Sequence, residues 1–157
     1  MSYLFPKRCR DYFKYTKYNV SGKSRLIDDY ILCLYVGLKF GKLGNSEELK
    51  GNPEILRTIP HDYVSNRTKE IITALLINTE LKRKKIDLED KAEVKKRVRA
   101  ILGQNITDDF SESGFLLLNR YALGGFDIIS KELGDRPTNS SESTERFFMK
   151  YIDLMTK

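Results

Sequence analysis

Residues 26–40 form the stretch around which the rest of the chain has to pack. From Tyr30 to Phe40 there is one charged residue in eleven. Apolar side chains recur at helical spacing on one face, at Ile27, Tyr30, Ile31, Leu34, Tyr35 and Leu38, and Leu32, Cys33 and Val36 fill the opposite face. A helix that is apolar nearly all round is buried inside a domain, and the segment is too long for an ordinary strand. The sequence therefore predicts a buried central helix at about residues 24–40.

Four further stretches carry the apolar periodicity of helices. They lie at about residues 65–83, from Asp87 to Gly103, at 108–134, and from about Glu142 onwards. No segment shows convincing alternation of period two. We therefore expect an all-α fold, a single compact domain of five or six helices around the central helix. Residues 1–157 would form this domain, with a basic aromatic N-terminal arm at 1–20 and a polar linker at 135–143 before the C-terminal helix.

Composition limits the cellular setting and the chemistry. No run of about eighteen apolar residues could span a membrane, and no signal-peptide core follows the first basic residues. The two cysteines, Cys9 and Cys33, belong to no metal-binding motif, and Cys33 lies on the buried helix. We expect a cytoplasmic, reduced protein with no metal, no cofactor and no membrane contact.

The net charge of +6 is distributed unevenly. Residues 1–25 hold seven cations against Asp11 alone: Lys7, Arg8, Arg10, Lys14, Lys17, Lys23 and Arg25. Residues 82–99 hold nine Lys and Arg against four acids, and the candidate binding residues there are Lys82, Arg83, Lys84, Lys85, Lys95, Lys96 and Arg99. Two basic segments on a mildly acidic body are typical of a surface that binds a polyanion. The alternative is that both segments are solvated surface.

The N-terminal arm mixes the two residue types that bind unpaired bases and phosphates. Six aromatic residues alternate with five cations between residues 3 and 18. Rings stack on bases while cations neutralise phosphates, so the mixture suits single-stranded or distorted nucleic acid. Alternatively the rings dock on the protein core and the charges face water. We favour docking for the rings and leave the role of the cations open.

The predicted third helix is basic and amphipathic. Its apolar face carries Ala92, Val94, Val98, Ile101 and Leu102, and its other face carries Lys91, Lys95, Lys96 and Arg99. This face suits a phosphate backbone, an acidic partner or solvent.

Catalysis finds little support in the residue pattern. Gly22-Lys23-Ser24 resembles the end of a P-loop, but the required glycine five residues earlier is replaced by Lys17. His61 is the only histidine and has no catalytic partner motif. The acids are scattered over predicted helix starts, where capping explains them: Asp28, Asp29, Asp87, Asp108 and Asp109. We expect no catalytic residue and a protein that is not an enzyme.

Gly124 and Gly125 lie within an otherwise apolar helical stretch. Two adjacent glycines destabilise a helix by roughly 2 kcal/mol relative to alanine. A geometric requirement is therefore expected there, which is a kink, a break or a close approach of another helix.

The order of these motifs resembles a known family. Val36-Gly37-Leu38-Lys39-Phe40-Gly41-Lys42, then Ile59-Pro60, then an apolar helix, then residues 119–133 (NRYALGGFDIISKEL) are similar to the small helical accessory proteins of bacterial Dnd systems. The resemblance covers roughly residues 20–134. It implies a role beside DNA phosphorothioate modification or its linked restriction machinery, in defence against foreign DNA. No catalytic residues carry over, and the Lys82–Lys85 run lies outside the family pattern.

Charge and resemblance together predict a non-catalytic, DNA-binding accessory subunit of a bacterial DNA-modification or anti-phage defence system. Its partners would be double-stranded DNA, bound mainly through phosphates, and other proteins of the same system. The alternative is a protein–protein scaffold or adaptor within such a system, without direct contact to DNA.

Overall fold

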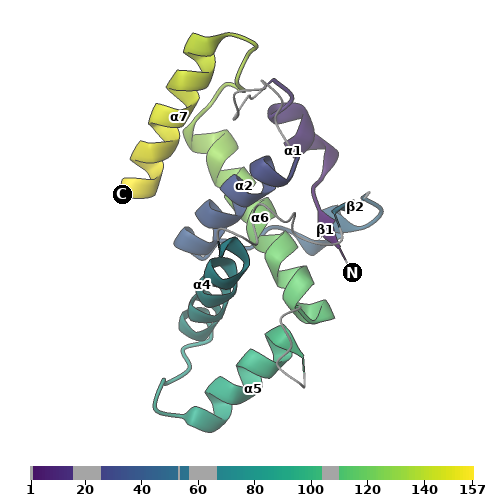
Figure 1. Cartoon of the computed structure of the whole chain (residues 1–157), viewed down its shortest axis with the longest axis vertical. Coiled ribbons are helices and arrows are strands. Elements are labelled where there is room, and N and C mark those ends of the chain that lie inside the picture. The colour runs from purple at the N-terminus through teal and green to yellow at the C-terminus, as the bar shows by residue number, and fades with distance from the viewer. Residues whose placement is uncertain (1, 16–25, 53, 57–66, 104–109) are drawn as a thin grey trace.

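A computed structural model of the chain describes residues 2–15, 26–52, 54–56, 67–103 and 110–157 (Figure 1). The elements within these residues are β1 (Tyr3–Leu4), α1 (Lys7–Tyr12), α2 (Leu26–Phe40), η1 (a 3₁₀ turn, Ser46–Leu49), β2 (Glu54–Leu56), α4 (Thr68–Arg83), α5 (Lys91–Leu102), α6 (Glu112–Glu132) and α7 (Ser141–Thr156). The predicted all-α fold around a buried central helix is confirmed.

The core is the crossing of α2 over the long helix α6. Nine of the fifteen residues of α2 are buried, including Leu34 and Val36, which are fully inaccessible to solvent. On α6 the apolar face places Leu118, Leu123 and Ile129 in the same core. The remaining described helices pack around this pair, which Figure 1 shows in the middle of the molecule.

Glycines allow the two helix backbones to touch at this crossing. A β-carbon on Gly125 would overlap the carbonyl oxygen of Cys33 and lie 2.6 Å from the backbone nitrogen of Gly37. A β-carbon on Gly37 would likewise overlap the carbonyl oxygen of Tyr121. α6 runs through Gly124 and Gly125 without a break, so of the three expected geometries the close helix–helix approach is the one observed.

Residues 42–44, which follow α2, are held against α6 by a second close contact. The Gly44 N–H donates to the Arg120 carbonyl oxygen at 2.7 Å, and the Arg120 Nε donates to the Gly44 carbonyl oxygen at 3.1 Å. A β-carbon on Gly124 would overlap the carbonyl oxygen of Lys42. The chain therefore leaves α2 along the side of α6.

The start of the chain is fastened to α6 by the buried side chain of Asn119. Its Oδ1 accepts hydrogen bonds from the Tyr30 hydroxyl at 2.9 Å and the Leu4 N–H at 3.0 Å, and its Nδ2 donates to the Ser2 carbonyl oxygen at 3.1 Å. β1 also pairs with β2 in a short antiparallel ladder. No alternation of period two indicates these strands in the sequence, because neither exceeds three residues.

Two predicted helix starts, those of α5 and α6, are wrong by a few residues because other side chains cap these helices, whereas α7 begins at Ser141, next to the predicted start at about Glu142. α5 begins after Asp90, whose Oδ1 accepts the Glu93 N–H at 3.1 Å, whereas Asp87 accepts the Glu89 N–H within the preceding turn. Ser111 caps α6 and Ser140 caps α7 through their hydroxyl oxygens. The first residues of the helix predicted at about 65–83, together with Asp108, Asp109 and His61, lie outside the described residues.

α7 packs against α2 and the segment after α1 at the upper end of the molecule. Phe147 packs against Phe13 with ring centroids 5.9 Å apart, and the Tyr151 hydroxyl donates to the Leu32 carbonyl oxygen at 3.0 Å. At the other end of the molecule from α7, α4 and α5 form a helical hairpin that extends from the lower end of the α2–α6 pair (Figure 1). No helix in the described part of the chain is both long enough and apolar enough to cross a membrane.

The close approach of α2 and α6 predicts whether Gly125→Ala stabilises or destabilises the protein. Alanine is favoured over glycine inside a helix by about 1 kcal/mol, so propensity alone would make Gly125→Ala stabilising. We expect instead a loss of roughly 1–3 kcal/mol or more, because the new methyl group meets backbone atoms of α2 that cannot rotate away. Urea denaturation of the two proteins measures the difference, and a variant more stable than the parent would contradict the close contact.

Candidate nucleic-acid interface

The cations predicted to bind nucleic acid lie, where the structure describes them, at two opposite ends of the molecule. Lys7, Arg8, Arg10 and Lys14 belong to α1 and the turn after it, at the upper end in Figure 1. Lys82, Arg83, Lys84, Lys85, Lys95, Lys96 and Arg99 belong to the α4–α5 hairpin at the lower end. Lys17, Lys23 and Arg25 lie outside the described residues. The described cations therefore do not form one continuous surface.

At the upper end, internal contacts occupy part of the predicted site. Both ends of the Arg8 guanidinium are paired, its Nε with Glu48 and an η nitrogen with Asp127, each at 2.8 Å. The guanidinium also lies over the Phe126 ring, 5.0 Å from its centroid. Arg8 thus ties α1 to α6 and η1.

The aromatic residues of the arm serve the core. The rings of Tyr3, Phe5, Tyr12 and Phe13 are buried, whereas Tyr15 is exposed beneath the Lys14 ammonium group, 5.4 Å away. Four of the five described rings are therefore unable to stack on bases. Among the described cations of the arm, Lys7, Arg8 and Lys14 are exposed, and of these Arg8 is held by its two carboxylate partners.

At the lower end, the cations are concentrated on a projecting element. We use the name basic hairpin for residues 82–99, which comprise the end of α4, the turn and most of α5. Its exposed cations other than Arg83 are Lys82, Lys84, Lys85, Lys91, Lys95, Lys96 and Arg99. Of the residues of α5, Ile101 alone is buried, so this helix presents most of its circumference to solvent.

A row of three cations follows one side of α5. Lys91, Lys95 and Arg99 are spaced four residues apart, which places successive side chains about 6 Å from one another along the helix. Glu93, the acid of this helix, lies on a different side and pairs with Lys96 at 3.1 Å. The row therefore presents positive charge that no acid of the same helix neutralises.

The acids of the hairpin turn are explained by local structure. Asp87 and Asp90 accept backbone N–H groups at the turn and at the start of α5. A carboxylate at a helix start is stabilised by the helix dipole. These acids hold the turn between the two helices, next to the cations rather than within their row.

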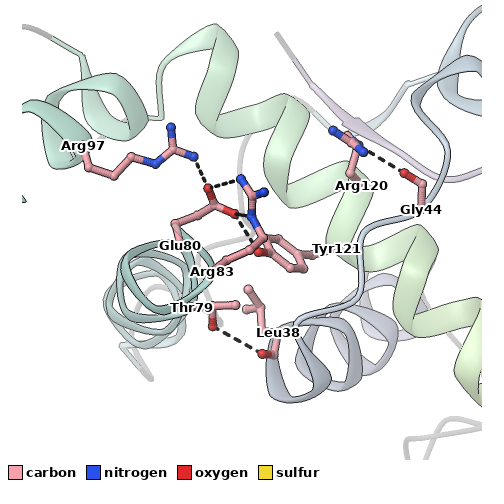
Figure 2. A network of polar contacts seen from close by, with 8 residues as sticks. All are labelled: Leu38, Gly44, Thr79, Glu80, Arg83, Arg97, Arg120 and Tyr121. Atoms are coloured by element: carbon pink, nitrogen blue, oxygen red, sulfur yellow. Dashed lines mark hydrogen bonds and ion pairs between the residues drawn. The ribbon is translucent and has the colours of Figure 1, made fainter. Parts of the chain in front are cut away.

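A buried carboxylate fixes the basic hairpin to the body of the protein (Figure 2). The Glu80 side chain is fully inaccessible, and its Oε1 accepts the Tyr121 hydroxyl at 2.6 Å and the Arg83 Nε at 2.8 Å. Its Oε2 accepts an η nitrogen of Arg83 at 2.9 Å and an η nitrogen of Arg97. Glu80 is therefore bound by α4, α5 and α6 at once.

This network changes the role of one predicted site residue. Arg83 was predicted to bind nucleic acid, but its guanidinium is engaged by Glu80 and stabilises the fold. Sequence reasoning overlooked Glu80, Arg97 and Tyr121 as a set. A signal was present, because Glu80 follows Ile72 and Leu76 at four-residue spacing and so falls on the buried face of α4.

The Glu80 carboxylate stays ionised in this setting. Burial favours the neutral acid, but the hydrogen bonds from Arg83, Tyr121 and Arg97 outweigh it and lower the pKa to about 2, from an ordinary value of 4.5. Burial and the neighbouring carboxylate also raise the pKa of the Tyr121 hydroxyl, which remains protonated and donates. A buried charge that keeps its partners is stable, whereas one that loses them is costly.

The lowered pKa of Glu80 predicts how stability depends on pH. In the unfolded chain this carboxylate takes up a proton near pH 4.5, whereas in the folded protein it does so near pH 2. The stabilisation is therefore complete above about pH 4.5 and is lost as the pH falls to about 2. We expect Glu80→Gln to lower the free energy of unfolding at pH 7 by roughly 2–4 kcal/mol and to flatten its decline below pH 4.5.

Urea denaturation at a series of pH values measures both effects. Glu93→Gln is the matched control, because it removes one exposed carboxylate from the same hairpin and should cost less than about 1 kcal/mol. Equal losses for the two variants would show that the Glu80 network does not hold the hairpin.

The described residues include no group of three or more His, Cys, Asp or Glu side chains that could hold a metal ion. Comparison with known proteins finds no matching family model, curated protein or solved structure. The basic hairpin, braced by Glu80, is therefore the candidate functional site on the strength of its own geometry and charge.

Proposed function

We propose that the chain is a non-catalytic accessory subunit that binds double-stranded DNA through the basic hairpin, within a bacterial DNA-modification or defence system. The observation that carries the proposal is the row of Lys91, Lys95 and Arg99 on a projecting helix. Phosphates provide most of the affinity of proteins that bind DNA without sequence preference, and Lys and Arg side chains are the groups that bind them.

The shape of the hairpin supports contact with a rigid duplex. α5 is held at its C-terminal end by Ile101 and the Ser111 N–H, which donates to the Ile101 carbonyl oxygen at 2.8 Å. Arg97 holds it to α4 through the ion pair with Glu80. The exposed cations are thus carried by a fixed scaffold, which lowers the conformational entropy lost on binding.

The preference for a duplex over single strands follows from what the hairpin lacks. The described residues 82–99 contain no aromatic side chain on which an unpaired base could stack. Lys and Arg at this spacing contact phosphates without reading base edges. Binding with little dependence on sequence is expected.

The cellular context of the proposal depends on the resemblance to Dnd accessory proteins. Two of the resembling motifs, residues 36–42 and 119–133, meet at the glycine contact between α2 and α6. The two motifs are thus consistent with a helix crossing that this chain would share with the Dnd accessory proteins. The Lys82–Lys85 run of the basic hairpin lies outside the family pattern, and the hairpin is proposed to contact DNA because of its own charge.

Neutralising the row tests the proposal. The variant Lys91→Gln/Lys95→Gln/Arg99→Gln should bind a short duplex more weakly, and the slope of log K against log salt should decrease by about 2–3, since each phosphate contact contributes about 0.9. Fluorescence anisotropy with duplexes of unrelated sequence provides both quantities.

The control variant removes the same charge elsewhere. Lys7→Gln/Lys14→Gln/Lys131→Gln changes three exposed lysines distant from the hairpin, and should leave the salt slope nearly unchanged. An equal decrease in both variants would show binding by net charge alone. Absence of binding by the unmodified protein at low salt would refute the DNA proposal and favour the scaffold alternative, for which the exposed apolar side chains described below provide a surface.

A further inference from the structure

Large apolar side chains are exposed along one side of the molecule. They are Ile71 (49% exposed) and Leu75 on α4, Phe40 (44%) at the end of α2, and Met149 (59%) and Ile152 (54%) on α7. Figure 1 shows α4 and α7 on the same side, at the left of the view. Exposed apolar side chains that gather on one face mark an interaction surface.

A groove joins the two halves of this surface. It has a volume of about 670 Å³ and lies between the end of α2, α4 and the end of α7. Leu38, Phe40, Leu75 and Met155 supply apolar lining, and Lys39 and Lys82 are among its polar residues. On α7, Met149, Ile152 and Met155 follow one another at three-residue spacing, so the apolar stripe of α7 leads into the groove.

The two halves of this apolar band carry opposite charge. On α4, Ile71, Leu75, Asn78 and Lys82 form one stripe, and Lys82 gives its groove end a positive charge. On the outer face of α7, Glu145, Arg146 and Asp153 each lie about one helical turn from Met149, and Arg146 is paired with Glu142 at 2.7 Å. The band is therefore basic in its α4 half, at the groove, and acidic in its α7 half.

We propose that a second copy of this chain covers the band, in a twofold-symmetric dimer that packs α7 of each copy against the α4 groove of the other. In a twofold interface one patch must be complementary to itself, with each of its halves meeting the other half in the partner. Here the acidic α7 half faces the basic α4 half twice. A partner of a different kind would need both an acidic and a basic apolar surface of its own, arranged to match the two halves of the band.

The dimer has a consequence for the shape of the assembly. The basic hairpin continues from α4, so two copies joined along this band carry two hairpins on one particle. The inference stands on the apolar band and its charges, and is tested without DNA, so it holds or fails separately from the proposed function.

Charge reversal provides the decisive experiment, with sedimentation velocity of the full chain across the micromolar range as the measurement. The unmodified protein should change from monomer to dimer as concentration rises. The variant Glu145→Lys/Asp153→Lys makes both halves basic, and Lys82→Glu makes the groove half acidic. Each alone should weaken self-association at least about tenfold, because like charges then face one another.

A mixture of the two variants should recover the association. The basic α7 of the first variant meets the acidic α4 of the second, and the acidic α7 of the second meets the basic end of α4 of the first. An apolar test is Ile152→Glu, which should abolish the dimer, and its control is Leu116→Glu, which places the same side chain at an exposed apolar position of α6 outside the band.

Three outcomes would overturn the inference. They are an unmodified protein that stays monomeric throughout, a mixture that fails to associate, or a Leu116→Glu protein that dissociates as readily as Ile152→Glu. Far-ultraviolet circular dichroism of each variant confirms that it is folded, which is expected because every substituted side chain is exposed.

Discussion

The backbone contact between α2 and α6 is the constraint on which the rest of this structure depends. Gly37 and Gly125 remove both side chains at the crossing, and the carbonyl oxygens of Cys33 and Tyr121 occupy the space where β-carbons would lie. Burial of α2 on nearly every side follows from this approach, because the surrounding helices can then enclose it. Such contacts are stabilised by dispersion forces and by the exclusion of water from closely packed apolar atoms.

The Glu80 network extends this core to the candidate site. Tyr121 lies one turn before Gly125 on α6, so the residue that binds Glu80 belongs to the same part of the crossing. From there Glu80 reaches Arg83 and Arg97, which fix the two helices of the basic hairpin. The position of the exposed cations thus depends, through one buried carboxylate, on the glycine contact some distance away.

The cations of this chain have two different roles. Arg8, Arg83 and Arg97 form internal ion pairs, whereas Lys91, Lys95 and Arg99 face solvent along α5. Composition counts all six alike, and a charge count therefore overestimates the cations that a nucleic acid could meet. The structure separates them because a guanidinium can bind carboxylates of the same chain at fixed geometry, as Arg8 binds Glu48 and Asp127, and as Arg83 and Arg97 bind the buried Glu80.

The sequence by itself determined the all-α class, the central helix and a geometric requirement at Gly124 and Gly125, and the structure decided that this requirement is a close helix–helix approach. Apolar periodicity and glycine preferences are local properties, which is why they can be read from consecutive residues. Tertiary structure decided that the described cations of the two basic segments lie at opposite ends, that Arg83 binds the buried Glu80, and that Glu80 meets Tyr121 across 41 positions of the chain. Such pairings join residues far apart in sequence, and a burial pattern on one helix indicates that a partner is needed without indicating which residue provides it.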